Sequence, residues 1–223
     1  MASDLKPIEP VTVITDLMLA IEGLVFGALL LYFWIKNEDQ RQTHDLMWIG
    51  TYFSIMIFAF FGALAHGTDS KTIEALVWPP TMIFGGITFI FLVAGVIIYQ
   101  KESDYAKLLI IPIVLFIIYL ILIIILNWPF ILWVLLLIVC SIIIYIYAFK
   151  AKSDGKALAP YLINGLTIII IAGVVQAIGG IIGYQTYFGP NNEYLFTPHN
   201  DIFHVIAMIG MYVFYRGFRK ASS

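Results

Sequence analysis

The chain has 223 residues, of which 61% are hydrophobic and only 12% are charged, and its formal net charge is −2. A soluble domain of this length cannot bury so much apolar surface, so the composition excludes a soluble protein and indicates a lipid bilayer as the solvent. The near-neutral charge gives no reason to expect a nucleic-acid partner, and one cysteine cannot build a disulfide framework.

Seven apolar segments are long enough to cross the hydrocarbon core, which takes about 20 residues in a helix. In chain order they are residues 11–35, 45–66, 81–99, 108–126, 129–149, 160–184 and 198–216. Pro79 and Pro80 stand at the expected start of the third span, and residues 68–80 are expected to lie in the membrane interface because they are polar. The predicted fold class is therefore all-α: one domain, residues 1–223, forming a polytopic bundle of seven transmembrane helices.

The placement of lysine and arginine predicts the orientation. Ten of them follow the first, third, fifth and seventh spans, whereas the other side carries only Lys6 and Lys71. The positive-inside rule then puts the C-terminus in the cytoplasm and the N-terminus outside. Frequent isoleucine and lysine, with no N-x-Ser/Thr acceptor, favour a multi-pass protein of a bacterial inner (cytoplasmic) membrane.

The polar residues of the spans gather at the expected outer face. Ionisable groups inside a membrane span are costly, so each marks a possible site. The set comprises Asp16 and Glu22 in the first span, His66 at the end of the second, Gln176 in the sixth, and Asn200, Asp201 and His204 at the start of the seventh. Asn200 and His204 are one helical turn apart and share a face, whereas His199 is expected to point elsewhere. Gly62 lies one turn below His66 and leaves room for an incoming group.

Two imidazoles and a carboxylate are a competent set of zinc ligands. We expect His66, His204 and Asp201 to bind zinc, with Asp16 as an alternative third ligand. Zinc lowers the pKa of a bound water and polarises a carbonyl group, so such a site supports hydrolysis of an amide or ester. The plainer interpretation is that His66 lies at the interface and Asp201 complements the N-terminus of its helix.

Glu22 and Asp16 are the candidates for catalytic proton transfer beside that metal. Gln176 and Asn200 are the neutral residues expected to help bind the cofactor. The expected partners are membrane lipids, including a lipid substrate; the sequence does not determine the oligomeric state. Retinal is excluded because every lysine lies in a loop or tail, and none can form a Schiff base inside a span.

The seven-span architecture and two motifs resemble the CREST superfamily, which includes alkaline ceramidases and the progestin/adiponectin receptors. The stretch "FFGALAHG", with His66, is similar to the Ser-xxx-His motif of the second span in that superfamily. The stretch "HNDIFHVIAMIG", with His204, is similar to the His-xxx-His motif of the seventh. The resemblance implies zinc-binding histidines, hydrolysis of lipid amides and, as in the ceramidase branch, an external N-terminus.

The chain departs from that pattern at three positions. Gly62 replaces the serine, Asn200 replaces the first histidine of the seventh span, and Trp78 stands near the place of an aspartate in the third. Three functions therefore stay open: a zinc-dependent hydrolase, a non-catalytic lipid- or metal-binding protein, and a haem protein with His66 and His204 as axial ligands. The haem protein ranks last because one haem near one face gives electrons no route across the bilayer.

Overall fold

The computed structural model describes residues 6–101, 105–127, 130–190 and 192–222. Its helices are α1 (Pro10–Lys36), α2 (Thr43–Gly67), α3 (Lys71–Lys101), α4 (Tyr105–Leu108), α5 (Ile110–Ile125), α6 (Phe130–Ser153), α7 (Ala159–Ile182) and α8 (Pro198–Ala221), with a short 3-10 helix, η1 (Glu38–Gln40). Strands β1 (Thr186–Phe188) and β2 (Tyr194–Phe196) form an antiparallel hairpin between α7 and α8. The prediction of an all-α helical bundle is confirmed, with this hairpin as the addition.

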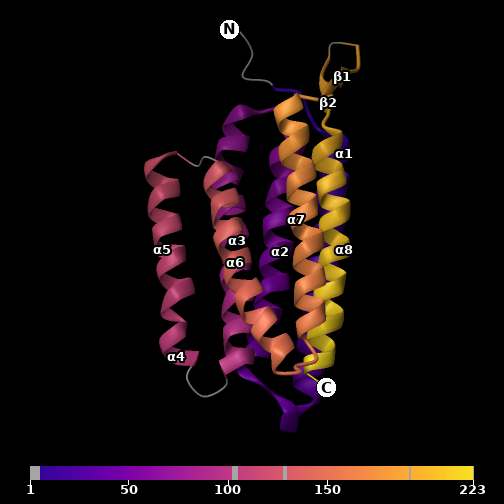
Figure 1. Cartoon of the computed structure of the whole chain (residues 1–223). Coiled ribbons are helices and arrows are strands. Elements are labelled where there is room, and N and C mark those ends of the chain that lie inside the picture. The colour runs from indigo at the N-terminus through magenta and orange to yellow at the C-terminus, as the bar shows by residue number, and fades with distance from the viewer. Residues whose placement is uncertain (1–5, 102–104, 128–129, 191, 223) are drawn as a thin grey trace.

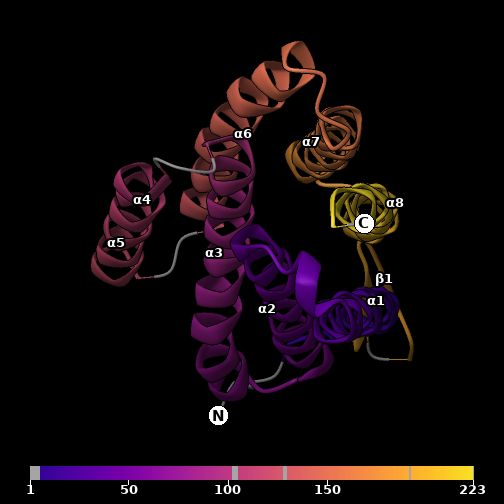
Figure 2. The same ribbon diagram turned by 90° about the horizontal axis from the view of Figure 1, so that it is seen from below.

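The long helices stand side by side (Figure 1), and all of them except α5 form a ring when the bundle is viewed end-on (Figure 2). Around the ring, α1 contacts α2, α2 contacts α3, α3 contacts α6, α6 contacts α7, α7 contacts α8, and α8 returns to α1. The end-on view shows α5 outside this ring, against α3 and α6 (Figure 2). The first and last helices are therefore neighbours, and residues near both ends of the chain can build one site.

Six of the described helices are long and apolar enough to cross a membrane: α1, α2, α3, α5 with the residues before it, α6 and α7. Lipid offers no hydrogen bonds to the backbone, and a helix satisfies its own, so apolar segments of this length fold as helices. The protein is therefore a multi-pass membrane protein. The seventh predicted span, α8, has 24 residues but is more polar, and it buries Asn200, Asp201 and His204 inside the bundle.

Helix α3 differs from the expected third span. It begins at Lys71 rather than at residue 81, and both Pro79 and Pro80 lie inside it. A proline removes one backbone donor and usually ends or kinks a helix, which is why the sequence favoured a start at this pair. The extra helical turns put Trp78 beside His66, with ring centroids 6.0 Å apart.

Glycines set two features of the bundle. Gly23 brings α1 against α2, because a Cβ built on it would lie 2.8 Å from the backbone atoms of Met56 and Tyr52. Gly183 ends α7 in the left-handed conformation, with φ 68°, and its N–H returns to the carbonyl of Gly179. Such a glycine cap stops the helix cleanly and lets the chain turn into the hairpin.

Candidate functional site

A cavity of about 260 Å³ lies inside the ring, toward the end that carries the hairpin. Its lining comes from the first three helices, from α6 to α8 and from the segments before α1 and α8: Glu9, Asp16, Phe58, Gly62, His66, Trp78, Thr81, Met82, Trp133, Gln176, Thr197, His199, Asn200, Phe203 and His204. Four aromatic rings and Met82 make the apolar part of the wall, and nine polar or ionisable residues converge on it. This combination is typical of a site for a small molecule.

Asp16 and His204 form the buried polar centre of the site. Their side chains come from α1 and α8 and are 3% and 5% exposed, and Nε2 of His204 lies 3.3 Å from Oδ1 of Asp16. Gly62 of α2 faces the same carboxylate, since a Cβ built on it would be 3.1 Å from Oδ2 of Asp16. Asp16 of α1 therefore faces both neighbouring helices, α2 and α8.

The other ring nitrogen of His204 contacts Thr15. Nδ1 lies 2.9 Å from Oγ1 of Thr15, and that hydroxyl also lies 3.1 Å from the carbonyl oxygen of Thr12. When the hydroxyl donates to that carbonyl, Thr15 accepts a hydrogen bond from Nδ1–H; when it turns to Nδ1 instead, Nε2 carries the ring proton and donates to Asp16. With Nδ1 protonated, attraction between Nε2 and Asp16 requires a shared proton, on either the imidazole or the carboxyl group. In every case Oδ2 of Asp16 remains an acceptor, and it is buried with no hydrogen-bond partner among the described residues.

His66 is held by Glu9, a residue that the sequence reasoning did not select. Nδ1 of His66 lies 3.0 Å from Oε1 of Glu9, while Oε2 accepts from the hydroxyl of Thr197 at 2.7 Å. Burial opposes the charge on Glu9, but its contacts with His66, Thr197 and the cation of Lys6 prevail and lower its pKa below the ordinary value of 4.5. A glutamate directly before the proline that starts the first span is the signal that could have revealed it.

The segment before α1 crosses the end of the bundle that carries the cavity. The backbone N–H of Glu9 donates to the carbonyl of His66, and the N–H of Ile8 donates to the carbonyl of Glu193 near β2. The Lys6 ammonium donates to the carbonyl of Ala65 at 2.8 Å and pairs with Glu74 at 2.9 Å. These bonds hold Glu9 over the cavity and join it to α2, α3 and the hairpin.

Gln176 and Asn200 form a second polar pair on the wall, between α7 and α8. Nε2 of Gln176 donates to Oδ1 of Asn200 at 2.8 Å. The Nδ2 group of Asn200, which lines the cavity, is not part of this bond. It makes no hydrogen bond within the described part of the chain. The cavity therefore offers an unpaired acceptor on Asp16 and an unpaired donor on Asn200.

Three predicted positions need separate description. Oδ1 of Asp201 accepts from the hydroxyl of Thr12 at 2.9 Å, so this carboxylate joins α8 to α1 and does not belong to the cavity lining. Glu22 also lies outside the lining, six residues after Asp16 on α1, and its buried Oε2 has no hydrogen-bond partner among the residues that the structure describes. His199, expected to point elsewhere, lines the cavity and packs against Gly179, because α7 and α8 approach closely there.

The residues match a zinc site only in part. His66 and His204 each have Nδ1 in a hydrogen bond, to Glu9 and Thr15, and metal-ligating histidines are usually oriented in this way. Across the described ranges, however, no three His, Cys, Asp or Glu side chains are grouped so that they could hold a metal ion. Asp16 and His204 form one adjacent pair of possible ligands, and Glu9 and His66 form another, so the groups stand in pairs rather than as a set of three.

The fold and the cavity define a class: a multi-pass helical membrane protein with a polar centre enclosed by its first and last helices. Residues 11–223 match one family model, described as a family of unknown function (DUF6962), and the chain belongs to that family. No curated protein and no solved structure matches the chain.

Proposed function

We propose that this protein binds an amphipathic molecule of the lipid class, with the polar group of that molecule in the cavity against Asp16. The unpaired Oδ2 of Asp16 carries the proposal. A buried polar atom without a partner is costly, and in native proteins it usually has a ligand, ion or water to explain it. The cavity has room for a polar group and a short length of chain, about the volume of eight or nine waters.

The chemistry of the wall selects the polar group. Because Oδ2 of Asp16 accepts in each protonation state of its pair with His204, the ligand must present a hydroxyl or an amide N–H there. The free donors of Asn200 favour a carbonyl or hydroxyl oxygen on the opposite side. The aromatic rings of Phe58, Trp133 and the other apolar lining residues favour an acyl or alkyl chain next to that group.

A matched pair of amphiphiles tests this selection. A long-chain alcohol should raise the thermal unfolding temperature of the purified protein, because a ligand that binds only the folded state stabilises it by mass action. The methyl ether of the same alcohol lacks the donor and should stabilise much less. Gly62→Leu should abolish the effect, whereas Gly180→Leu should retain it, since nothing lies within 4 Å of a Cβ at Gly180. Equal stabilisation by alcohol and ether, or none by either, would refute the proposal.

A zinc-dependent hydrolase of lipid amides or esters is the second candidate. The hydrogen-bonded Nδ1 atoms of His66 and His204 favour it, because metal-ligating histidines are usually oriented in this way through their other nitrogen. At His204, a metal on Nε2 would have to replace the proton that this nitrogen shares with Asp16. Bound zinc would supply a Lewis acid beside the ligand. Elemental analysis of wild type, His66→Ala and His204→Ala decides: near-stoichiometric zinc that both variants lose supports this candidate, and zinc-free wild type eliminates it.

We further propose that the cavity opens toward the outer face of a bacterial inner membrane. The ends of α1 and α6 and the C-terminus lie at the end of the bundle opposite the hairpin (Figure 1). Lys36 and Lys152 belong to the last turns of these two helices, and Arg41 and Lys156 follow shortly after them. This basic end would face the cytoplasm under the positive-inside rule. A reporter enzyme fused to the C-terminus should be active only on the cytoplasmic side; activity on the other side would reverse the orientation.

A further inference from the structure

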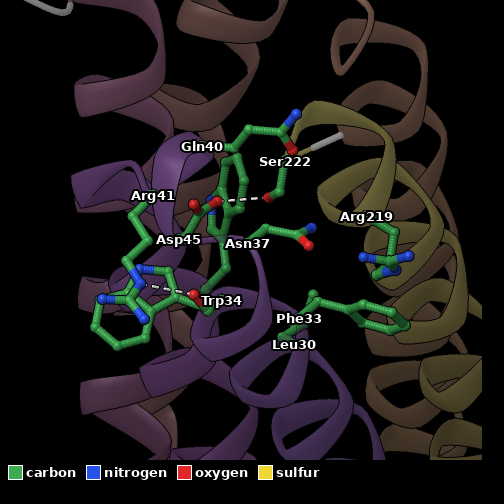
Figure 3. Close-up of a pocket in the computed structure, with 10 residues that line it drawn as sticks. Leu30, Phe33, Trp34, Asn37, Gln40, Arg41, Asp45, Arg219 and Ser222 are labelled. Atoms are coloured by element: carbon green, nitrogen blue, oxygen red, sulfur yellow. Dashed lines mark hydrogen bonds between the residues drawn. The ribbon is translucent and has the colours of Figure 1, made fainter.

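A second pocket lies at the other end of the bundle, between the end of α1, η1 and the last turn of α8 (Figure 3). Its lining comprises Leu30, Phe33, Trp34, Asn37, Gln40, Arg41, Asp45, Trp48, Arg219 and Ser222. It shares no residue with the cavity around Asp16.

Arg219 is the distinctive residue of this pocket. Its guanidinium carbon lies 3.3 Å from the centroid of the Phe33 ring, so the aromatic face holds the side chain in place. Among the described residues, Arg219 has no hydrogen bond and no ion pair through its guanidinium group. The nearby carboxylate of Asp45 is already used, because it accepts from the N–H of Gln42 at 3.0 Å and from the hydroxyl of Ser222.

The pocket has more donors than acceptors. The side-chain amides of Asn37 and Gln40 have no hydrogen-bond partner within the described ranges, and Figure 3 shows Asn37 directed to the same side of the pocket as Arg219. Arg41 lies on the other side of Trp34, where it donates to the carbonyls of Trp34 and Ile35. Arg41 therefore holds the segment between α1 and α2. The guanidinium of Arg219 and the side-chain amides of Asn37 and Gln40 remain available to a ligand that accepts hydrogen bonds.

We propose that Arg219, with Asn37 and Gln40, binds the phosphate group of an anionic phospholipid or of free phosphate. An arginine fork matches the geometry of phosphate oxygens, and the amides add donors for the remaining oxygens. The position supports this ligand, since the pocket lies at the basic end of the bundle, where Lys36 ends α1 and Lys220 belongs to the last turn of α8. Basic pockets between helices at this level are suited to lipid head groups.

Thermal unfolding in nanodiscs tests the site. Phosphatidic acid should raise the unfolding temperature of wild type relative to diacylglycerol with the same acyl chains, which lacks only the phosphate. Arg219→Gln should lose this rise, and Arg219→Lys should keep part of it. Arg216→Gln is the matched control, because it removes an exposed arginine one turn earlier in α8, and it should retain the rise. Each variant is first compared with wild type in neutral lipid, so that a folding defect is recognised.

Inorganic phosphate, added to the protein in neutral detergent, separates the two sources. Stabilisation by phosphate that requires Arg219 identifies a soluble ligand; stabilisation by phosphatidic acid alone identifies a lipid head group. The proposal is overturned if Arg219→Gln responds to both probes as wild type does, or if it loses no more than Arg216→Gln.

Discussion

Nε2 of His204 lies 3.3 Å from Oδ1 of Asp16, and this contact joins the last helix of the bundle to the first. Thr15 bonds to the same imidazole, and Thr12 bonds to Asp201 one turn away. The seam between α1 and α8 is therefore polar and buried, whereas much of the outer surface of these helices is apolar. Bonds of this kind in a membrane interior fix the register of two helices as well as their contact.

A double-mutant cycle measures how strongly Asp16 and His204 are coupled. Asp16→Asn and His204→Gln should each lower the free energy of unfolding, because each leaves the other buried group without its partner. The double variant should lose less than the sum, by about 0.5–3 kcal/mol, as expected for groups in direct contact. Unfolding in denaturant gives the four values. Additive losses would show that the two side chains do not interact.

Gly62→Ser should stabilise the protein relative to Gly62→Ala. A Cβ at this position would lie 3.1 Å from Oδ2 of Asp16, which is a tight fit. Serine and alanine both add this Cβ, so the loss of stability from crowding is common to both variants. Only serine adds a hydroxyl that can donate to that unpaired oxygen, which is worth about 1 kcal/mol. The comparison uses the unfolding temperatures of the two variants without added ligand. A serine variant no more stable than the alanine variant would show that Oδ2 does not need a donor.

Acid should weaken the end of the bundle at which Glu9 holds His66 and Thr197. The pKa of Glu9 is lowered in the folded protein, so its contribution to stability is fully present above about 4.5, the ordinary value, and is lost as the pH falls through the lower folded pKa. Glu9→Gln should be less stable at neutral pH and should show a smaller loss in this acid window. If the stability of Glu9→Gln and of wild type fell in parallel as the pH is lowered, Glu9 would not be the group that carries this pH dependence.

Gly23→Ala should destabilise the bundle by about 1–3 kcal/mol, because the added methyl would meet backbone atoms of Met56 and Tyr52 that cannot move aside separately. Gly180→Ala is the control: its Cβ would meet nothing within 4 Å, and alanine is the better helix former by up to about 1 kcal/mol. Chemical denaturation compares the two. Equal stabilities would mean that α1 and α2 do not pack closely at Gly23.

The fold was largely predictable because lipid imposes one requirement on every span. Apolar segments of sufficient length must be helical, and their approximate ends follow from composition. Of the seven expected spans, the last, α8, is helical but is not among the six described helices that are apolar enough to cross a membrane. The start of α3 was not predictable in this way, since Pro79 and Pro80 normally mark a helix boundary and here lie inside one. The hairpin after Gly183 was also missed, because its strands have three residues each and leave almost no periodic pattern.

The sequence indicated the end of the bundle at which the polar residues gather, but not which of these side chains contact one another. Asp16 and His204 were both selected, and their contact depends on the adjacency of α1 and α8, which no local pattern contains. Glu9 was overlooked because it precedes the first apolar run and resembles an ordinary polar flank. The zinc set of His66, His204 and Asp201 stays a prediction; the structure turns Asp201 toward Thr12.

The most direct test of the central claim is native mass spectrometry of the protein released from mild detergent. If the cavity at Asp16 holds an amphipathic molecule, wild type and Gly180→Leu should each carry about one bound molecule of the lipid class that survives gentle activation. Gly62→Leu, which fills the space beside Asp16, should carry none. Wild type without a bound molecule in the presence of excess lipid, or Gly62→Leu with the same occupancy as wild type, would contradict the account.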